Sequence, residues 1–175
     1  MRNRILVSCS IFLLVFAGCD KVDELLTFTI SHQVTFQIEN STPLNLPIEI
    51  ATPDVTTNSS QTFENNNTSA GLVKDVKLQE IKLAVTNPSG KTFSFLKSIK
   101  LYISTDQNNE IELASLDDIP TTATSITLTP TKEKLDTYVK ASAYKLRTSI
   151  VTREALTQTL DVRADLKFKV TAAPL

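Results

Sequence analysis

Residues 26–39 alternate strictly between apolar and polar side chains, and this alternation constrains the fold more than any other feature of the sequence. The even positions hold Leu26, Phe28, Ile30, His32, Val34, Phe36 and Ile38, and the odd positions hold only Thr, Ser, Gln or Glu. Successive side chains of a β-strand point to opposite faces, whereas a helix would spread these apolar positions around its circumference. The segment is therefore predicted to be a half-buried strand.

A second alternating segment lies near the other end of the chain. One parity holds Leu156, Leu160, Val162, Ala164, Leu166, Phe168 and Val170, and it faces charged residues and threonines on the other. Weaker patterns predict further strands over 44–50, 76–86, 93–104, 110–114, 125–129 and 144–151, which makes about eight in all. Pro47 cannot donate a ladder hydrogen bond, so it places the strand over 44–50 at a sheet edge.

Turn-forming residues separate the predicted strands, for example over 87–90, 106–109 and 117–120. One short helix is predicted near 131–141, where Thr131 can cap the first turn and Leu135, Tyr138 and Val139 share one face. Strands at this spacing lack the regular alternation with helices that a parallel sheet needs. We therefore predict an all-β fold, an antiparallel β-sandwich that is either immunoglobulin-like or jelly-roll-like.

Two segments depart from this simple pattern. The first predicted strand would span ~43 Å at ~3.3 Å per residue, so we expect it to bend or change sheets near Ser31 and His32. The polar stretch over 52–70 is long for a structureless connection, and it is either a mobile loop or a contact loop. The candidate contact residues are Phe63, Asn65, Asn66 and Asn67. The alternative for Phe63 is that it packs onto the edge of the sandwich.

The sequence offers little chemistry. Gly71 and Gly90 are the only glycines after residue 18, so no glycine-rich phosphate-binding loop can form, and a nucleotide partner is excluded. The single histidine, His32, cannot build a multi-histidine zinc site, and its place in the apolar row favours a structural role. No serine lies in a recognisable nucleophile motif. We therefore expect no catalytic residue, no metal and no cofactor.

The charge balance also excludes a nucleic-acid partner. Without Arg2 and Arg4, the 18 basic residues become 16 against 19 acidic ones, a formal charge of −3. No basic stripe and no basic motif with interleaved aromatic residues occurs in the chain.

The first 18 residues have the layout of a secretory signal peptide. Arg2 and Arg4 precede an apolar run over 5–18. A helix of about 14 residues rises roughly 21 Å, which is shorter than the ~30 Å hydrocarbon core, so the run does not suit a membrane-spanning anchor. Residues 1–18 are therefore predicted to be an export signal.

The residues Phe16-Ala17-Gly18-Cys19 resemble a bacterial lipobox. In that family a signal peptidase cuts before the cysteine, here between Gly18 and Cys19, and the thiol then carries a diacylglycerol, with fatty acids such as palmitate. This resemblance implies a lipid bilayer as the first partner of the chain. Multiple acyl chains on one cysteine anchor a protein stably without a spanning helix.

The predicted organisation is a signal peptide over 1–18, a lipidated tether over 19–25 and a single β-sandwich domain over 26–175. Asp20 resembles an inner-membrane retention signal, whereas Asp23 and Glu24 resemble signals for export to the outer surface. We favour the outer membrane, with either a periplasmic or a surface-facing orientation. The short tether would hold the domain close to the bilayer. This position favours a protein that acts together with other envelope proteins.

The mature domain is also similar to small β-sandwich lipoproteins of Gram-negative envelopes, on the pattern over 82–104, the segment Leu135 to Tyr138 and the closing strand. The leading hypothesis is a non-catalytic envelope lipoprotein that binds protein partners, through an edge strand or through residues 52–70. The alternative is an accessory protein that binds cell-surface polysaccharide. A hydrolase is the third possibility.

Overall fold

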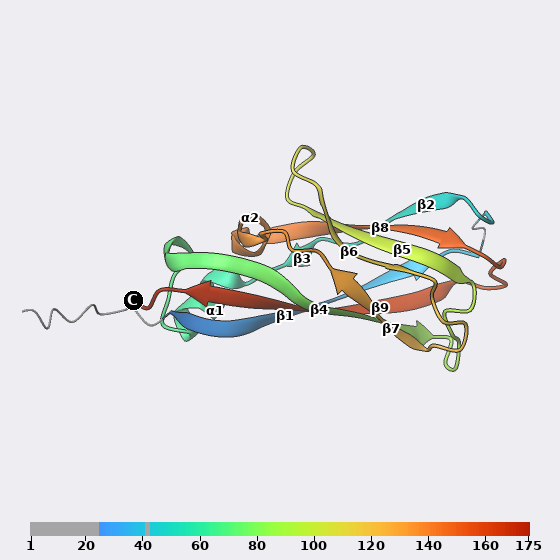
Figure 1. Ribbon diagram of the computed structural model, residues 1–175, viewed down its shortest axis with the longest axis horizontal. Coiled ribbons are helices and arrows are strands. Elements are labelled where there is room, and N and C mark those ends of the chain that lie inside the picture. The colour runs from blue at the N-terminus through green and yellow to red at the C-terminus, as the bar shows by residue number, and fades with distance from the viewer. Residues whose placement is uncertain (1–24, 41–42) are drawn as a thin grey trace, which may run out of the picture.

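Antiparallel strands dominate the computed structural model, which describes residues 25–40 and 43–175 (Figure 1). The strands in this part of the chain are β1 (Leu26–Ile38), β2 (Pro47–Ala51), β3 (Val55–Thr56), β4 (Val73–Asn87), β5 (Leu96–Ser104), β6 (Ile111–Asp117), β7 (Ser125–Pro130), β8 (Ala143–Thr152) and β9 (Leu160–Ala172). The helical elements are α1 (Ser59–Asn65), the 3-10 turn η1 (Ala70–Leu72) and α2 (Asp136–Lys140).

The strands follow one hydrogen-bonded path, in the order β1-β9-β4-β7-β6-β5-β8-β2, and β3 also pairs with β8. The sheet folds over at β7, because residues 125–128 pair with β4 and residues 129–130 pair with β6. One layer thus holds β1, β9 and β4, and the other holds β6, β5, β8 and β2. The predicted all-β, antiparallel sandwich is confirmed, with two layers that belong to one curled sheet.

The alternating segments bury the predicted rows. In β9 every even residue from Leu160 to Ala172 is buried, and in β1 the even residues from Ile30 to Ile38 are buried except His32, which is half-buried. These rows meet the inward residues of the other layer in one core. Because each fully buried aliphatic or aromatic side chain contributes about 1.5–3 kcal/mol, the matching parity of neighbouring strands holds the layers together.

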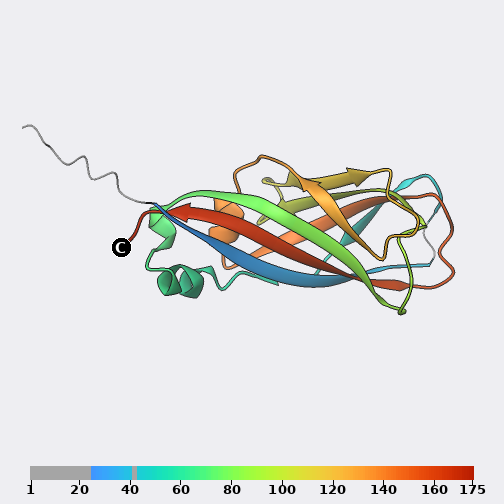
Figure 2. The ribbon, with the colours of Figure 1, turned by 60° about the horizontal axis from the view of Figure 1, so that its bottom comes forward.

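The change of sheet that the sequence allowed at Ser31 and His32 does not occur. β1 pairs with β9 along all 13 residues, from Leu26 opposite Ala172 to Ile38 opposite Leu160, with no register shift. The reason is that β9 is equally long and that its buried even-numbered residues lie opposite the even-numbered residues of β1. No residue of β1 would become more deeply buried by pairing with another strand. Figure 2 shows β4, β9 and β1 side by side along the length of the body, with β1 at the margin.

The predicted helix near 131–141 is shorter than expected. α2 spans only Asp136–Lys140, and Thr131 does not cap it. Instead, the Thr131 hydroxyl donates to the carbonyl oxygens of Glu112 and Leu113, at the end of the pairing between β6 and β7. The predicted apolar face is confirmed, because Leu135, Tyr138 and Val139 are all buried.

Strand boundaries differ from the prediction mainly at the closing strand. β9 begins at Leu160, and Leu156 lies in the connection from β8, half-buried against the core. β3 was not predicted, since two residues are too few to show a period. Pro47 does open an edge strand, because β2 pairs with β8 alone.

The strand register defines two ends of the molecule. At the first end, Leu26 of β1 and Val73 of β4 both lie opposite Ala172 of β9, beside α1 and η1. We call this the tether end, because residues 19–25 lead into it. At the other end, Ile38 lies opposite Leu160, and the connections β4–β5 and β8–β9 meet. We call this the distal end.

Replacing Phe168 with Asp is expected to abolish folding. Phe168 is fully buried at the centre of β9, where an unpaired carboxylate cannot be solvated. Phe168→Ala should leave a cavity and lower the unfolding free energy by about 3–5 kcal/mol. Circular dichroism and urea unfolding measure both effects. Lys169→Asp, at the exposed next position, is the control and should fold normally; a folded Phe168→Asp protein would mean that the β9 register is wrong.

Candidate functional site

The curled sheet leaves two edges, and they face each other along one side of the sandwich. β1 is the edge of the first layer, and β2 followed by β3 forms the edge of the second layer, since both pair with β8. β1 approaches both β2 and β3. We call the line between these edges the seam. The seam brings together a strand edge and part of the segment over 52–70. The sequence predicts these two kinds of surface as binding sites for a partner.

A groove of about 420 Å³ opens in the seam. One wall is formed by six consecutive residues of β1, numbers 29–34, and the other wall by residues 54–58 together with Thr62. Both walls are largely extended backbone, so the groove presents main-chain groups together with hydroxyl and amide side chains. Asp54 is the only ionised side chain among the residues that line it.

His32 joins the two layers within this groove. Its Nε2 lies 3.3 Å from the carbonyl oxygen of Thr57, and its Nδ1 lies 2.8 Å from the hydroxyl oxygen of Tyr144. Because a carbonyl oxygen can only accept, we assign the proton to Nε2, and Nδ1 then accepts from the Tyr144 hydroxyl. The predicted structural role of His32 fits these contacts, since both ring nitrogens are occupied by hydrogen-bond partners from within the chain.

The surroundings of His32 favour the neutral ring. Burial lowers the pKa of His32 below its ordinary value of 6.5, and the hydrogen bond to Thr57 opposes this only in part. The rings of Tyr144 and Phe168 lie beside it, with centroids 5.5 and 5.6 Å away. Burial also raises the pKa of Tyr144, so its hydroxyl stays protonated as a donor. The neutral His32 ring, with its hydrogen bonds to Thr57 and Tyr144, thus joins the two sides of the seam, and we call this arrangement the buried clasp.

The polar stretch over 52–70 is folded, with β3 and α1 inside it. Three buried hydroxyl side chains tie it down. Thr57 bonds to Ser59 and to the carbonyl of Ala141, and Thr68 donates to the carbonyl oxygen of Ala173 at 2.6 Å. Buried hydroxyls with partners cost little, so a polar composition here does not indicate a mobile loop.

The four candidate contact residues lie in and just after α1. Phe63 is 1% exposed and packs against Phe28 with ring centroids 6.4 Å apart, so it belongs to the core and cannot reach a partner. The side chains of Asn65 and Asn66 bond to residues one turn earlier in α1. Asn67 has a positive φ of 53°, which suits an asparagine. These residues shape the end of α1 and do not line the groove.

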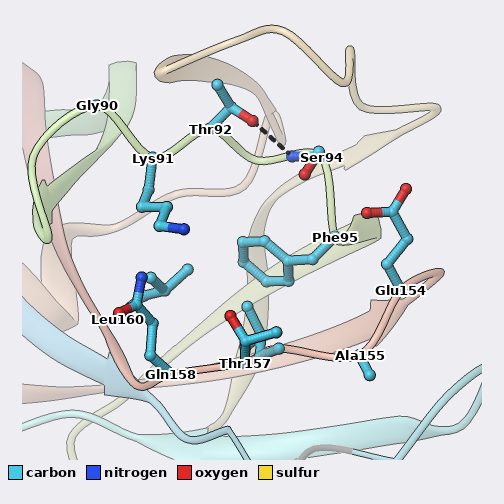
Figure 3. Close-up of a pocket in the computed structure, with 11 residues that line it drawn as sticks. Gly90, Lys91, Thr92, Ser94, Phe95, Glu154, Ala155, Thr157, Gln158 and Leu160 are labelled. Carbon is cyan, nitrogen blue, oxygen red and sulfur yellow. Dashed lines mark hydrogen bonds between the residues drawn. The ribbon is translucent and has the colours of Figure 1, made fainter.

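A second pocket lies at the distal end, between the connections β4–β5 and β8–β9 (Figure 3). The Lys91 side chain and the Phe95 ring extend into it, whereas the Glu154 carboxylate points away. The Arg153 guanidinium donates to the carbonyl oxygens of Leu96 and Ile119, which links the connection β8–β9 to the start of β5 and to the connection β6–β7. The pocket is small, at about 350 Å³, and it holds a single inward cation.

Gly18 and Cys19, the predicted cleavage and lipidation positions, lie outside the described residues. The signal peptide over 1–18 and most of the tether over 19–25 also lie outside them. Within residues 25–40 and 43–175, no helix is both long enough and apolar enough to cross a bilayer.

Comparisons with known proteins add little. No family model matches the sequence, and no curated protein matches it. Crystal structures of the BFDV capsid protein match as a 60-mer with a TM-score of 0.46, at 12% identity over 87% of this chain and 95% of that chain, and as a decamer with 0.44, at 10% identity over 85% and 99%. Desmodium yellow mottle tymovirus matches with 0.31, at 12% identity over 86% and 90%. Scores below 0.5 define no topology, and the fold assignment rests on the strand pairing.

The pKa of His32 is expected to lie below 6.5. It is the only histidine of the chain, so an NMR titration of its ring reports this group without ambiguity. A lowered pKa in the folded state means that the neutral ring stabilises the protein above pH 6.5, and that this stabilisation is lost as the pH falls through the folded-state pKa. Urea unfolding at pH 7.5 and pH 5 should show the loss.

The variant His32→Gln cannot titrate, so its unfolding free energy should change less over the same pH interval. A folded-state pKa at or above 6.5 would contradict the buried clasp.

Proposed function

We propose that this chain is a lipid-anchored protein of the bacterial envelope, held at the outer membrane through Cys19, that binds protein partners at the seam and has no catalytic activity. The observation that carries the protein-binding part is the groove between β1 and residues 54–58, where the edge strands of the two layers meet at one opening. Extended backbone at a sheet edge is a common means of recognising protein segments.

Two contacts support a non-catalytic role. His32 is the single histidine, and its ring bonds to a phenol and a backbone carbonyl instead of a serine or threonine hydroxyl. A neutral His32 with a lowered pKa whose acceptor nitrogen is already occupied is a poor general base for an added substrate.

The tyrosines favour a protein partner over a polysaccharide. Sugar-binding platforms usually present flat aromatic faces to solvent. Tyr138 and Tyr144 are buried, and the guanidinium carbon of Arg147 lies 4.0 Å from the centroid of the Tyr102 ring. Tyr102 is thus the one tyrosine of the described residues that is not buried, and Arg147 covers one face of its ring.

Cys19→Ala is expected to abolish membrane attachment. Each buried methylene of an acyl chain contributes ~0.8 kcal/mol, so losing the acyl chains removes the anchor. Metabolic labelling with palmitate and fractionation of cells measure the effect. Cys9→Ala is the matched control, because Cys9 lies within the predicted signal and should leave labelling unchanged. An unlabelled parent protein, or a Cys19→Ala protein that stays with the membranes, would refute the anchor.

Crosslinking in intact envelopes, followed by purification, is expected to join this chain to another envelope protein. The short tether keeps the seam within reach of neighbours on the same membrane. A chain that migrates as a monomer and captures no envelope protein contradicts the proposal. So does a specific ligand on a glycan array, and so does turnover in a broad substrate screen that disappears in His32→Ala.

A further inference from the structure

Apart from the approach of β2 and β3 across the seam, the outer edge of β1 lacks the features that normally protect a sheet edge. Natural edge strands are short, carry charged residues or proline, or contain bulges, because a bare edge pairs with other chains. β1 is 13 residues long, and its sequence LTFTISHQVTFQI contains no Asp, Glu, Lys, Arg, Pro or Gly. Its ladder with β9 has no bulge.

β2, the opposite edge, has this protection. It is only five residues long and begins with Pro47. Glu49 at its centre accepts from the guanidinium of Arg147 and from the hydroxyl of Ser149, both on β8. The same chain thus has a protected edge at β2 and an edge without charge, proline or bulge at β1. This difference suggests that β1 pairs with another chain.

We propose that an extended segment of a partner protein adds as a strand beside β1. This inference rests on the proposed function and names the kind of partner. In an antiparallel ladder, about half of the residues direct their N–H and C=O groups toward one neighbour and the rest toward the other side. Within residues 25–40 and 43–175, the backbone hydrogen bonds outside the regular ladders include none from Leu26–Ile38. An added strand would satisfy this free row.

The seam provides a place for the inward side chains of that strand. Next to β1, the groove is lined mainly by hydroxyl and amide side chains, and the half-buried ring of His32 lies among them. A strand paired with β1 would direct alternate side chains onto this surface and the others to solvent. The inward positions of the partner segment should therefore include polar side chains that hydrogen-bond to this surface.

The outward positions should be polar and largely uncharged. On the outer face, β1 presents Thr, Ser and Gln at every exposed position, and such residues pair well with threonine, serine or amide side chains across strands. Asp54, exposed at the groove, would favour one lysine or arginine in the partner. An exposed ion pair of this kind contributes to orientation more than to affinity.

A second copy of the chain that pairs in antiparallel fashion is a poorer occupant. Two β1 strands that pair in antiparallel fashion place their first residues at opposite ends, ~43 Å apart. The six residues from Asp20 to Leu25 reach at most ~20 Å from the acylated cysteine, so two upright copies on one bilayer cannot pair in this way. A partner segment from another protein has no such limit.

Amide hydrogen exchange over Leu26–Ile38 tests the strand addition. In the lipidated protein extracted into detergent, about half of the β1 amides should exchange slowly, namely those bonded to β9. In intact envelopes, nearly all of the β1 amides should exchange slowly, because the partner strand would bond to the remaining half. Residues of β9, which has neighbours on both sides, should show the same exchange in both samples and serve as the internal control.

Site-specific crosslinking in the same envelopes tests the position. A photo-crosslinking residue in place of Gln33 should capture another protein, whereas one at Thr127 on β7 should not. The double variant Thr29→Lys, Thr35→Lys places charges along the edge without touching the core, and it should lower the yield about tenfold. Ser125→Lys with Thr129→Lys, on β7 where the chain passes from β4 to β6 and away from the seam, is the matched control and should leave the yield unchanged.

Exchange that is equal in envelopes and detergent would overturn strand addition, even if crosslinking captures a protein and so upholds the proposed function. Capture that joins only two copies of this chain would also overturn it, as would a yield that both lysine pairs lower equally. Failure of all capture would refute the proposed function as well.

Discussion

The structure depends on the pairing of β9 with β1 on one side and β4 on the other. All three strands are long, and their apolar rows must face the same layer for any of them to be buried. A slip of one residue would turn the Phe168 row to solvent and bring Lys167 and Lys169 into the core, so the register is strongly fixed. The ladder with β4 contains three register shifts, whereas the ladder with β1 contains none. β1 therefore pairs regularly along its whole length, at the edge of its layer.

The fold-over at β7 follows from this ladder and creates the seam. Because residues 125–128 of β7 continue the first layer and residues 129–130 open the second, the two terminal strands of the path, β1 and β2, come to lie on the same side. The chain then runs from β1 back along the opposite edge as β2 and β3. His32 and Thr57 meet across the seam for this reason, although 25 residues separate them in sequence. The Tyr144 hydroxyl on β8 completes the link between the layers.

Local patterns in the sequence predict the fold class well and the site poorly. Parity predicts the buried row of β9 and the edge position of β2, because strand alternation and proline chemistry are local effects. It cannot predict that Thr131 bonds to Glu112 and Leu113 instead of capping a helix, or that the hydroxyls of Thr57 and Thr68 find buried partners, since these depend on residues far away in sequence. Nor can it predict that Phe63 lies in the core, because its partner Phe28 is also far away in sequence. One signal for the site is visible in the sequence: Leu26–Ile38 contains no charge, proline or glycine.

A bare edge of 13 residues carries a risk of self-association, and the proposed anchor bears on that risk. Antiparallel pairing of two copies requires one of them to turn end over end. On a bilayer, a tether of six residues at the first end of β1 keeps upright copies in the same orientation, which excludes that arrangement over much of the range of tilt. A partner strand from a neighbouring protein is not restricted in this way. The proposed lipid anchor and the uncharged edge are therefore compatible features, because the first would limit the antiparallel pairing that the second would otherwise allow.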